Sequence, residues 1–172
     1  MPKSIKTKMG SWGSKSTWGG RSDAFGKADD KTRVCKTCGA RFMKKHWVHS
    51  ADTKKTSGKD AKIAFTECPA CRMKHDHTFE GEILMRSFEK TQKKEILRLI
   101  KNIGERAYLR DPMDRILETE DLGERMRITT SENQLALRMG KKIKSVFKGD
   151  LVIHWSKEDE VVRITWEGPA TK

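Results

Sequence analysis

The sequence predicts an α+β protein in which a small cysteine-bearing sheet precedes an α-β-β-α-β-β domain, behind a disordered basic tail. Three observations predict this class: two Cys-x-x-Cys pairs, two amphipathic helical patterns, and two pairs of short strand patterns that each follow a helix. We expect four segments: a flexible Gly/Lys/Trp tail (1–31), the cysteine segment (32–86), the α+β domain (87–168) and a C-terminal tail (169–172).

The four cysteines of the chain form two pairs, Cys35 with Cys38 and Cys68 with Cys71. Two residues between thiols allow both sulfurs of one turn to bind the same metal ion, and two such turns complete a tetrahedral set. Four thiolates leave no coordination position for water or substrate, so the pattern predicts one structural Zn²⁺ in a zinc ribbon. A redox dithiol, disulfides and an iron–sulfur cluster remain as alternatives.

The rest of the cysteine segment has short strand patterns around a polar loop. We expect strands through 41–48, 63–65 and 78–85, with 54–62 as a basic loop and Pro69 stiffening the second cysteine turn. Four histidines lie close to the cysteines in sequence: His46, His49, His75 and His77. Because four thiolates already fill a tetrahedral site, we expect these histidines at the surface or in contact with RNA.

The charge of the chain is strongly positive. There are 37 Lys and Arg residues against 24 Asp and Glu, which gives a formal net charge of +13 and a pI near 9.7. This surplus favours a polyanionic partner, most plausibly nucleic acid, although charge alone does not separate RNA from DNA. No apolar run approaches the length of a membrane span and no signal peptide is recognisable, so we expect no membrane association. Paired thiols in such a chain fit a reducing cytoplasm.

The tail carries aromatic residues between basic ones. Trp12 and Trp18 each follow a hydroxyl residue, serine or threonine, and precede a glycine, and Lys15 and Arg21 lie close to them. Such segments can stack on unpaired bases while cations contact phosphates, so we interpret these four residues as nucleic-acid contacts. Lys54 and Lys55 of the basic loop are further candidates. The alternative is a solvated leader whose aromatic residues have no function.

The α+β domain begins with an amphipathic helix that Pro112 ends. Its apolar residues recur at steps of three and four and fall on one face: Ile96, Leu99, Ile100, Ile103 and Ala107. Lys94, Arg98 and Lys101 lie on the other side of this helix and are candidate RNA contacts. Two strands, 116–119 and 125–128, then flank a turn at 121–124.

A second amphipathic helix is expected to begin near Ser131, which forms a capping box with Gln134, and to end at Gly149. Its polar face provides four candidate contacts to an RNA backbone: Arg138, Lys141, Lys144 and Lys148. These cations could also be merely solvated. A final hairpin places Trp155 and Trp166 on one face of the sheet, where we expect both to pack under the helices.

The second helix and the last strand carry a resemblance. The segments 129–140 and 147–151, with Val162-Arg163-Ile164-Thr165-Trp166, resemble a poorly characterised prokaryotic group that joins two Cys-x-x-Cys knuckles to an α/β domain. Leu137 departs from that pattern, because the group usually has a second arginine there. More remotely, the arrangement is similar to the zinc-ribbon export adaptor of the archaeal and eukaryotic large ribosomal subunit. This similarity implies binding to ribosomal RNA or ribosomal proteins.

The expected function is therefore that of a cytoplasmic zinc-ribbon RNA-binding protein associated with the ribosome, acting in translation inhibition, hibernation or subunit maturation. The alternative is a zinc-ribbon DNA-binding or transcription-associated factor. We expect no enzyme and no small-molecule substrate, because the sequence has no G-x-S-x-G, H-E-x-x-H or Walker motif. Glu80 and Glu82 are interpreted as solvated charges on one face of a strand.

Overall fold

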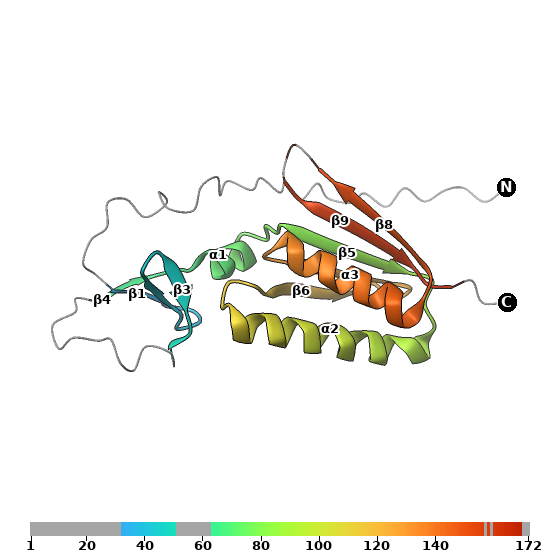
Figure 1. Cartoon of the computed structure of the whole chain (residues 1–172), viewed down its shortest axis with the longest axis horizontal. Helices are drawn as coiled ribbons and strands as arrows, with labels where there is room; N and C mark the ends of the chain where they lie inside the picture. Colours follow the sequence, from blue (N-terminus) through green and yellow to red (C-terminus); the bar gives the residue numbers. More distant parts are fainter. Residues whose placement is uncertain (1–31, 51–62, 157, 159, 170–172) are drawn as a thin grey trace.

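The structure is a computed structural model that describes residues 32–50, 63–156, 158 and 160–169. Within these residues the chain is mixed α/β, with three helices and two sheets. A cysteine module (described residues 32–50 and 63–76) lies beside a sheet module (77–169) along the long axis of the molecule (Figure 1).

The cysteine module has a four-stranded sheet in the order β3-β2-β1-β4. Its strands are β1 (Thr32–Cys35), β2 (Arg41–Met43), β3 (His46–Val48) and β4 (Ile63–Thr66). β1 pairs antiparallel with β2 but parallel with β4. The single strand predicted over 41–48 is in fact a hairpin, because Lys44 and Lys45 turn the chain with φ of 48° and 70°. The second cysteine pair likewise opens a helix, α1 (Pro69–His75), where a turn was predicted, and Pro69 occupies its first turn.

The sheet module contains the predicted order of helices and hairpins: α2 (Lys90–Arg110), β6 (Ile116–Asp121), β7 (Arg125–Thr130), α3 (Asn133–Phe147), β8 (Asp150–Trp155) and β9 (Val162–Glu167). The strand predicted over 78–85 is β5 (Gly81–Arg86), but it does not belong to the cysteine module. It is the central strand of a five-stranded sheet, β6-β7-β5-β9-β8, antiparallel to β7 and parallel to β9.

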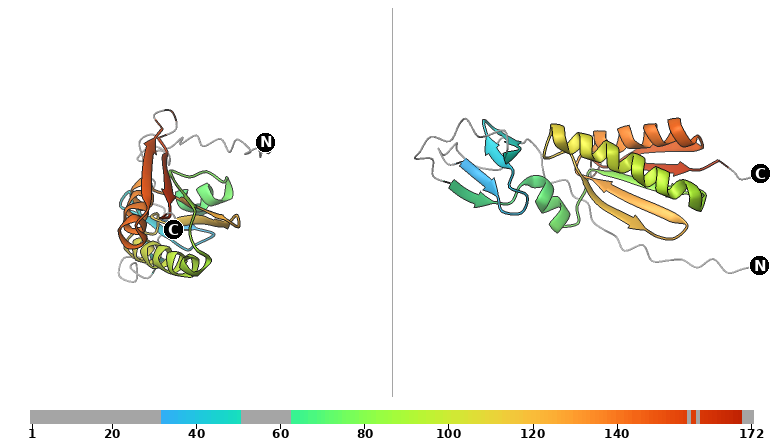
Figure 2. Two further views of the ribbon diagram at one scale, coloured as in Figure 1. Left: turned by 90° about the vertical axis from the view of Figure 1, so that its right-hand side faces the viewer. Right: turned by 90° about the horizontal axis from the view of Figure 1, so that it is seen from below.

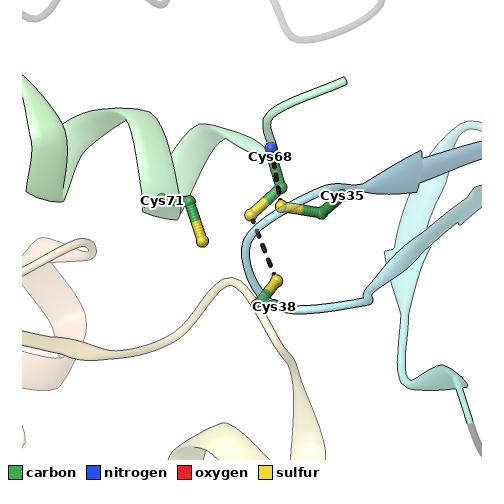
Figure 3. Close-up of side chains that lie close together, drawn as sticks. All are labelled: Cys35, Cys38, Cys68 and Cys71. Carbon is green, nitrogen blue, oxygen red and sulfur yellow. Dashed lines mark hydrogen bonds between the residues drawn. The ribbon is translucent and has the colours of Figure 1, made fainter. Parts of the chain in front are cut away.

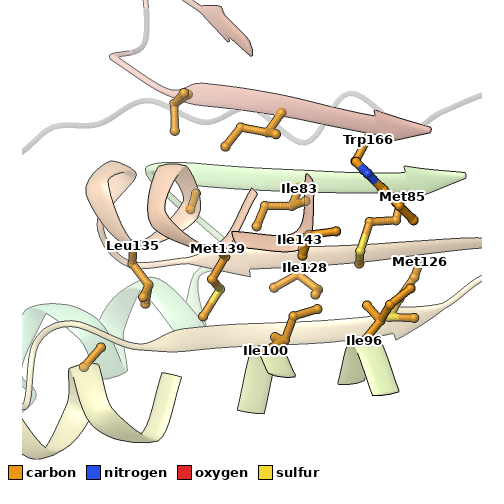
Figure 4. Close-up of a cluster of buried hydrophobic side chains, with 14 residues drawn as sticks. Ile83, Met85, Ile96, Ile100, Met126, Ile128, Leu135, Met139, Ile143 and Trp166 are labelled. Atoms are coloured by element: carbon orange, nitrogen blue, oxygen red, sulfur yellow. The ribbon is translucent and has the colours of Figure 1, made fainter. Parts of the chain in front are cut away.

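Helices α2 and α3 both cover one face of the five-stranded sheet (Figure 2). The buried cluster between helices and sheet includes the labelled residues of Figure 4: Ile83, Met85, Ile96, Ile100, Met126, Ile128, Leu135, Met139, Ile143 and Trp166. These are the apolar positions of the helical and strand patterns, and their removal from water stabilises the module.

The two tryptophans of the last hairpin differ, against the prediction that both pack under the helices. Trp166 is fully buried, and its indole N–H donates to the main-chain carbonyl of Lys148 at 2.7 Å. Trp155 is 47% exposed, because it lies at the end of β8, an edge strand of the sheet. Alternation predicts which face a side chain occupies, but only the position of the strand in the sheet decides how far it is covered.

The start of α3 also differs from the prediction. Ser131 does not cap the helix, which begins at Asn133 with Glu132 at the N-cap and has no side-chain cap hydrogen bond. Instead, the Ser131 hydroxyl donates to the Met113 carbonyl at 2.6 Å and accepts from the main-chain N–H of Arg115 at 2.8 Å. The predicted end is present, since Gly149 has φ of 76° directly after the helix.

Candidate metal centre and nucleic-acid interface

The four cysteine sulfurs meet in the cysteine module (Figure 3). Cys35 ends β1, Cys38 lies in the turn before β2, and Cys68 and Cys71 flank the start of α1. All four Sγ atoms lie within 4.8 Å of one another, and the Cys38 and Cys68 sulfurs are 3.7 Å apart. The thiols are free, and three of the four residues are buried. This group could hold one metal ion.

The distances suit a tetrahedral thiolate site. A metal–sulfur bond of about 2.3 Å, as in zinc sites, places neighbouring sulfurs of a tetrahedron about 3.8 Å apart. The 3.7 Å separation of the Cys38 and Cys68 sulfurs is close to this value, and far longer than the roughly 2.05 Å of a disulfide. The main chain supports the cluster: the Cys68 N–H donates to the Cys35 sulfur at 3.3 Å. Gly39, with φ of 74°, closes the first turn by donating to the Cys35 carbonyl.

The electrostatics of the cluster call for a cation. Burial by itself raises the pKa of Cys35, but hydrogen bonds from main-chain N–H groups, that of Cys68 first, lower it to about 6. Burial raises the pKa of Cys68 well above its ordinary value, and repulsion from Cys38 adds to the effect. Burial also raises the pKa of Cys71, to about 11. The protein alone therefore favours the thiolate of Cys35 and disfavours those of Cys68 and Cys71, which a bound divalent cation would stabilise.

Arg115 is the residue of this site that the sequence analysis missed. From the segment between α2 and β6, its guanidinium donates to the Cys38 sulfur at 3.2 Å and to the Cys71 sulfur at 3.5 Å. Its guanidinium carbon also lies 5.0 Å from the ring centroid of Tyr108. Burial lowers the pKa of a guanidinium, but the hydrogen bond and charge of Cys38 raise the pKa of Arg115.

Nothing local marks Arg115, because it lies 44 residues from Cys71 and 77 from Cys38 in sequence. It belongs to the sheet module, so its hydrogen bonds connect the cysteine cluster to the neighbouring fold. A metal site with four thiolates has a net negative charge, so a neighbouring cation would stabilise it. Hydrogen-bonding partners stabilise metal ligands in the same way in proteins generally.

The histidines lie outside the cysteine cluster, which among the described residues contains cysteines alone. His49 Nε2 is 2.6 Å from the main-chain carbonyl oxygen of Tyr108, and the two rings meet edge to face. His77 Nδ1 is 2.9 Å from a carboxylate oxygen of Glu118. These two side chains therefore make contacts within the fold.

The predicted basic faces are exposed on the two long helices. On α2 the cations Lys94, Arg98 and Lys101 point to solvent, as do Arg138, Lys141, Lys144 and Lys148 on and just after α3. Two of the seven are in ion pairs: Arg138 with Asp114 at 3.1 Å, and Lys101 with Glu105 at 3.7 Å. The six other candidates, namely Trp12, Lys15, Trp18, Arg21, Lys54 and Lys55, lie outside the described residues.

The opposite face of the sheet is balanced in charge. Glu82, predicted as a solvated charge, accepts a hydrogen bond from Arg127 at 2.6 Å and lies 3.8 Å from Arg163. Arg127 also pairs with Glu120 at 3.1 Å. Glu80 precedes β5 and lines a cavity beside the cysteine module. The two glutamates therefore have different surroundings, and on this face of the sheet Arg127 and Arg163 lie beside carboxylates.

No protein-family model, curated protein or solved structure matches this chain. The resemblance to the two-knuckle group and to the ribosomal export adaptor therefore stays a prediction. No helix of the described part of the chain is both long and apolar enough to cross a membrane.

Proposed function

We propose that this chain is a zinc-stabilised RNA-binding protein that associates with the ribosome in the cytoplasm. The zinc ion would bind Cys35, Cys38, Cys68 and Cys71 and serve the fold, because four thiolate ligands leave no open position for catalysis. Paired thiols held for a metal ion fit a reducing compartment.

One observation carries the proposal: the layer formed by α2 and α3 has a large surplus of positive charge. Helix α2 has seven basic and two acidic residues and α3 has four basic and none acidic, so the layer has a formal charge of 11 − 2 = +9. The apolar faces of both helices are used in the core, so the cations gather on the outer side. Such a surface attracts a phosphate backbone and releases its counterions.

The shape of the layer favours RNA over a DNA groove. An α-helix with its side chains is about 10–12 Å wide, and the major groove of B-DNA, about 12 Å wide, admits one helix. Here two helices lie side by side on one sheet face, so neither protrudes alone. A broad basic surface of this kind suits backbone contacts along folded RNA. The resemblance noted above supports the ribosome as the source of that RNA.

A role in blocking translation rests on the tail. Trp12 and Trp18, between glycines and lysines, would stack on unpaired bases or enter a ribosomal groove. Deleting residues 1–31 is then expected to abolish inhibition of cell-free translation while ribosome binding, which the helices support, is retained. The double variant Trp12→Ala, Trp18→Ala should behave in the same way, and full inhibition by both proteins would leave the tail without this role.

The experiment that tests the proposal reverses charge on the helix layer. The triple variant Lys141→Glu, Lys144→Glu, Lys148→Glu removes exposed cations without touching the core, and leaves Arg138 with its ion pair. Each lost phosphate contact should reduce the slope of log affinity against log salt by about 0.7–0.9. Affinity for ribosomes and for a folded RNA is measured by sedimentation and by fluorescence anisotropy at several salt concentrations.

A matched control has the same change in net charge elsewhere on the surface. Lys44, Lys74 and Arg125 are exposed and belong to the β2–β3 turn, α1 and β7 rather than to α2 or α3, so reversing all three should reduce affinity much less. Equal affinity and equal salt slope in the two triple variants would refute the proposed interface. Tighter binding to duplex DNA than to RNA under the same conditions would favour the transcription-factor alternative.

A further inference from the structure

A cavity of about 430 Å³ lies where the cysteine module meets the sheet module. Its walls come from the β2–β3 hairpin, the start of α1, the segment after α2 and the residues just before α3. Small-molecule sites in proteins are typically clefts of about 300–1,000 Å³ with a largely apolar wall and a few polar groups. The cavity therefore has the size of a site for a nucleotide.

The wall combines apolar side chains with hydrogen-bond acceptors. The ring centroids of Phe42 and Trp47 lie 5.5 Å apart at an interplanar angle of 57°, and Pro112 lines the same cavity. Trp47 is buried, so the half-buried ring of Phe42 is the aromatic surface that a ligand can reach. Aromatic surfaces of this kind take up unstacked bases. Glu80 and Glu132 line the cavity as well, and their carboxylates are hydrogen-bond acceptors only.

Cations line the cavity as well. Lys45, in the turn between β2 and β3, and Arg110, at the end of α2, are exposed lining residues. A ligand that suits all these groups has a planar ring, N–H donors on the ring edge and a negative charge. Among the four RNA bases, guanine presents adjacent N1–H and N2–H donors that a carboxylate can accept together.

The backbone of the β2–β3 hairpin gives an independent indication that this cavity has a function. Lys44 and Lys45 both have positive φ, 48° and 70°, in a two-residue turn of the kind that Asn-Gly normally occupies. Side chains with a Cβ are disfavoured in this conformation. Backbone strain of this kind is concentrated at functional sites in proteins, where it positions a side chain that takes part in function. At this turn, the side chain held beside the cavity is that of Lys45.

We infer that this cavity binds an unpaired guanine nucleotide of the RNA, with the base between the aromatic wall and the carboxylates and its phosphate at Lys45 and Arg110. The inference rests on the proposed function and deepens it: the helix layer supplies affinity for the backbone, and the cavity supplies selection of one base. Pro69 and Ala70 at the start of α1 also line the cavity, so a metal ion bound by Cys68 and Cys71 would hold this wall in place.

The test compares two neighbouring lysines. Lys44→Gly and Lys45→Gly each remove one charge and relieve one positive φ, but only Lys45 lines the cavity. Binding of GMP and AMP to the full chain is measured by calorimetry and ligand-observed NMR. GMP is expected to bind about tenfold or more tightly than AMP, as for bidentate recognition of a base edge. Lys45→Gly should weaken GMP binding about tenfold, and Lys44→Gly less than about twofold.

Oligonucleotides extend the test to RNA. A uridine octamer with one central guanine should bind more tightly than the same octamer with adenine or inosine, because inosine lacks the N2 amino group. The Glu132→Gln variant should lose this preference while its far-UV circular dichroism spectrum stays that of the parent chain. Equal affinity for GMP and AMP, no GMP binding, or equal losses in the two lysine variants would overturn the inference. None of these outcomes depends on charge reversal in α3, so failure here and failure of the proposed function are distinguishable.

Discussion

Replacing Arg115 with methionine is expected to weaken zinc binding about 10- to 100-fold. The change removes the charge and both N–H donors to the Cys38 and Cys71 sulfurs, at 3.2 and 3.5 Å, but retains an unbranched apolar stem of similar length. Charge-assisted hydrogen bonds are roughly twice as strong as neutral ones, and partial burial limits their screening by water.

The magnitude follows from what such partners contribute in metal sites generally. Losing one hydrogen-bonding partner of a ligand typically costs 10- to 100-fold in metal affinity. At about 1.4 kcal/mol for each factor of ten, this corresponds to about 1.4–2.8 kcal/mol. Arg115 serves two ligands at once, so we expect the upper half of this range.

The assay is competition for Zn²⁺ against a chromophoric chelator at fixed pH. Arg115→Lys keeps the charge but lacks the planar fork that reaches two sulfurs and lies over Tyr108, so it should recover only part of the affinity. Arg110→Met is the matched control, since Arg110 is exposed and pairs with Asp114 rather than with a cysteine. Zinc affinity of Arg115→Met within twofold of the parent protein would refute the reasoning.

Three further predictions concern stability. Cys68→Ser should abolish metal binding and unfold the cysteine module, because metal binding supplies folding free energy. The core between the helices and the five-stranded sheet should keep its protection from amide hydrogen exchange. Loss of that protection across β5, β7 and β9 would contradict this prediction. Trp166→Phe should cost about 1–3 kcal/mol in urea unfolding, because it shortens a fully buried side chain and removes the N–H that donates to the part-buried carbonyl of Lys148. Trp155→Phe, at an exposed site, should change stability by less than about 0.5 kcal/mol. Gly81→Ala should destabilise the fold by about 2–3 kcal/mol, because a Cβ there would lie 2.4–2.5 Å from side-chain atoms of β7 and α3. Gly123→Ala, in open space at φ of 78°, should cost only about 1 kcal/mol of backbone strain, and equal losses in the two variants would contradict the packing argument.

Elements that depend on local pattern were predictable. The spacing within each cysteine pair identified the four sulfurs that lie within 4.8 Å of one another, because a two-residue gap brings both thiols of a turn to one side. The helices α2 and α3 followed from apolar residues at steps of three and four, and their exposed lysines followed from the same periodicity. Positive charge on one side of each helix is thus a property of the sequence itself.

Tertiary structure decided everything that depends on partners distant in the chain. Strand β5 follows the cysteines directly, yet it pairs with β7 and β9, because alternation defines a face but not a neighbour. Ser131 has the sequence pattern of a helix cap, but in the packed fold its hydroxyl donates to the Met113 carbonyl and accepts from the Arg115 N–H instead. Arg115 reaches the cysteine sulfurs only because the two modules pack together. The sequence by itself therefore determined the cysteine cluster that could hold a metal ion and the basic helices, whereas packing between segments far apart in the chain decided which cation contacts the cysteine sulfurs and which residues enclose the cavity.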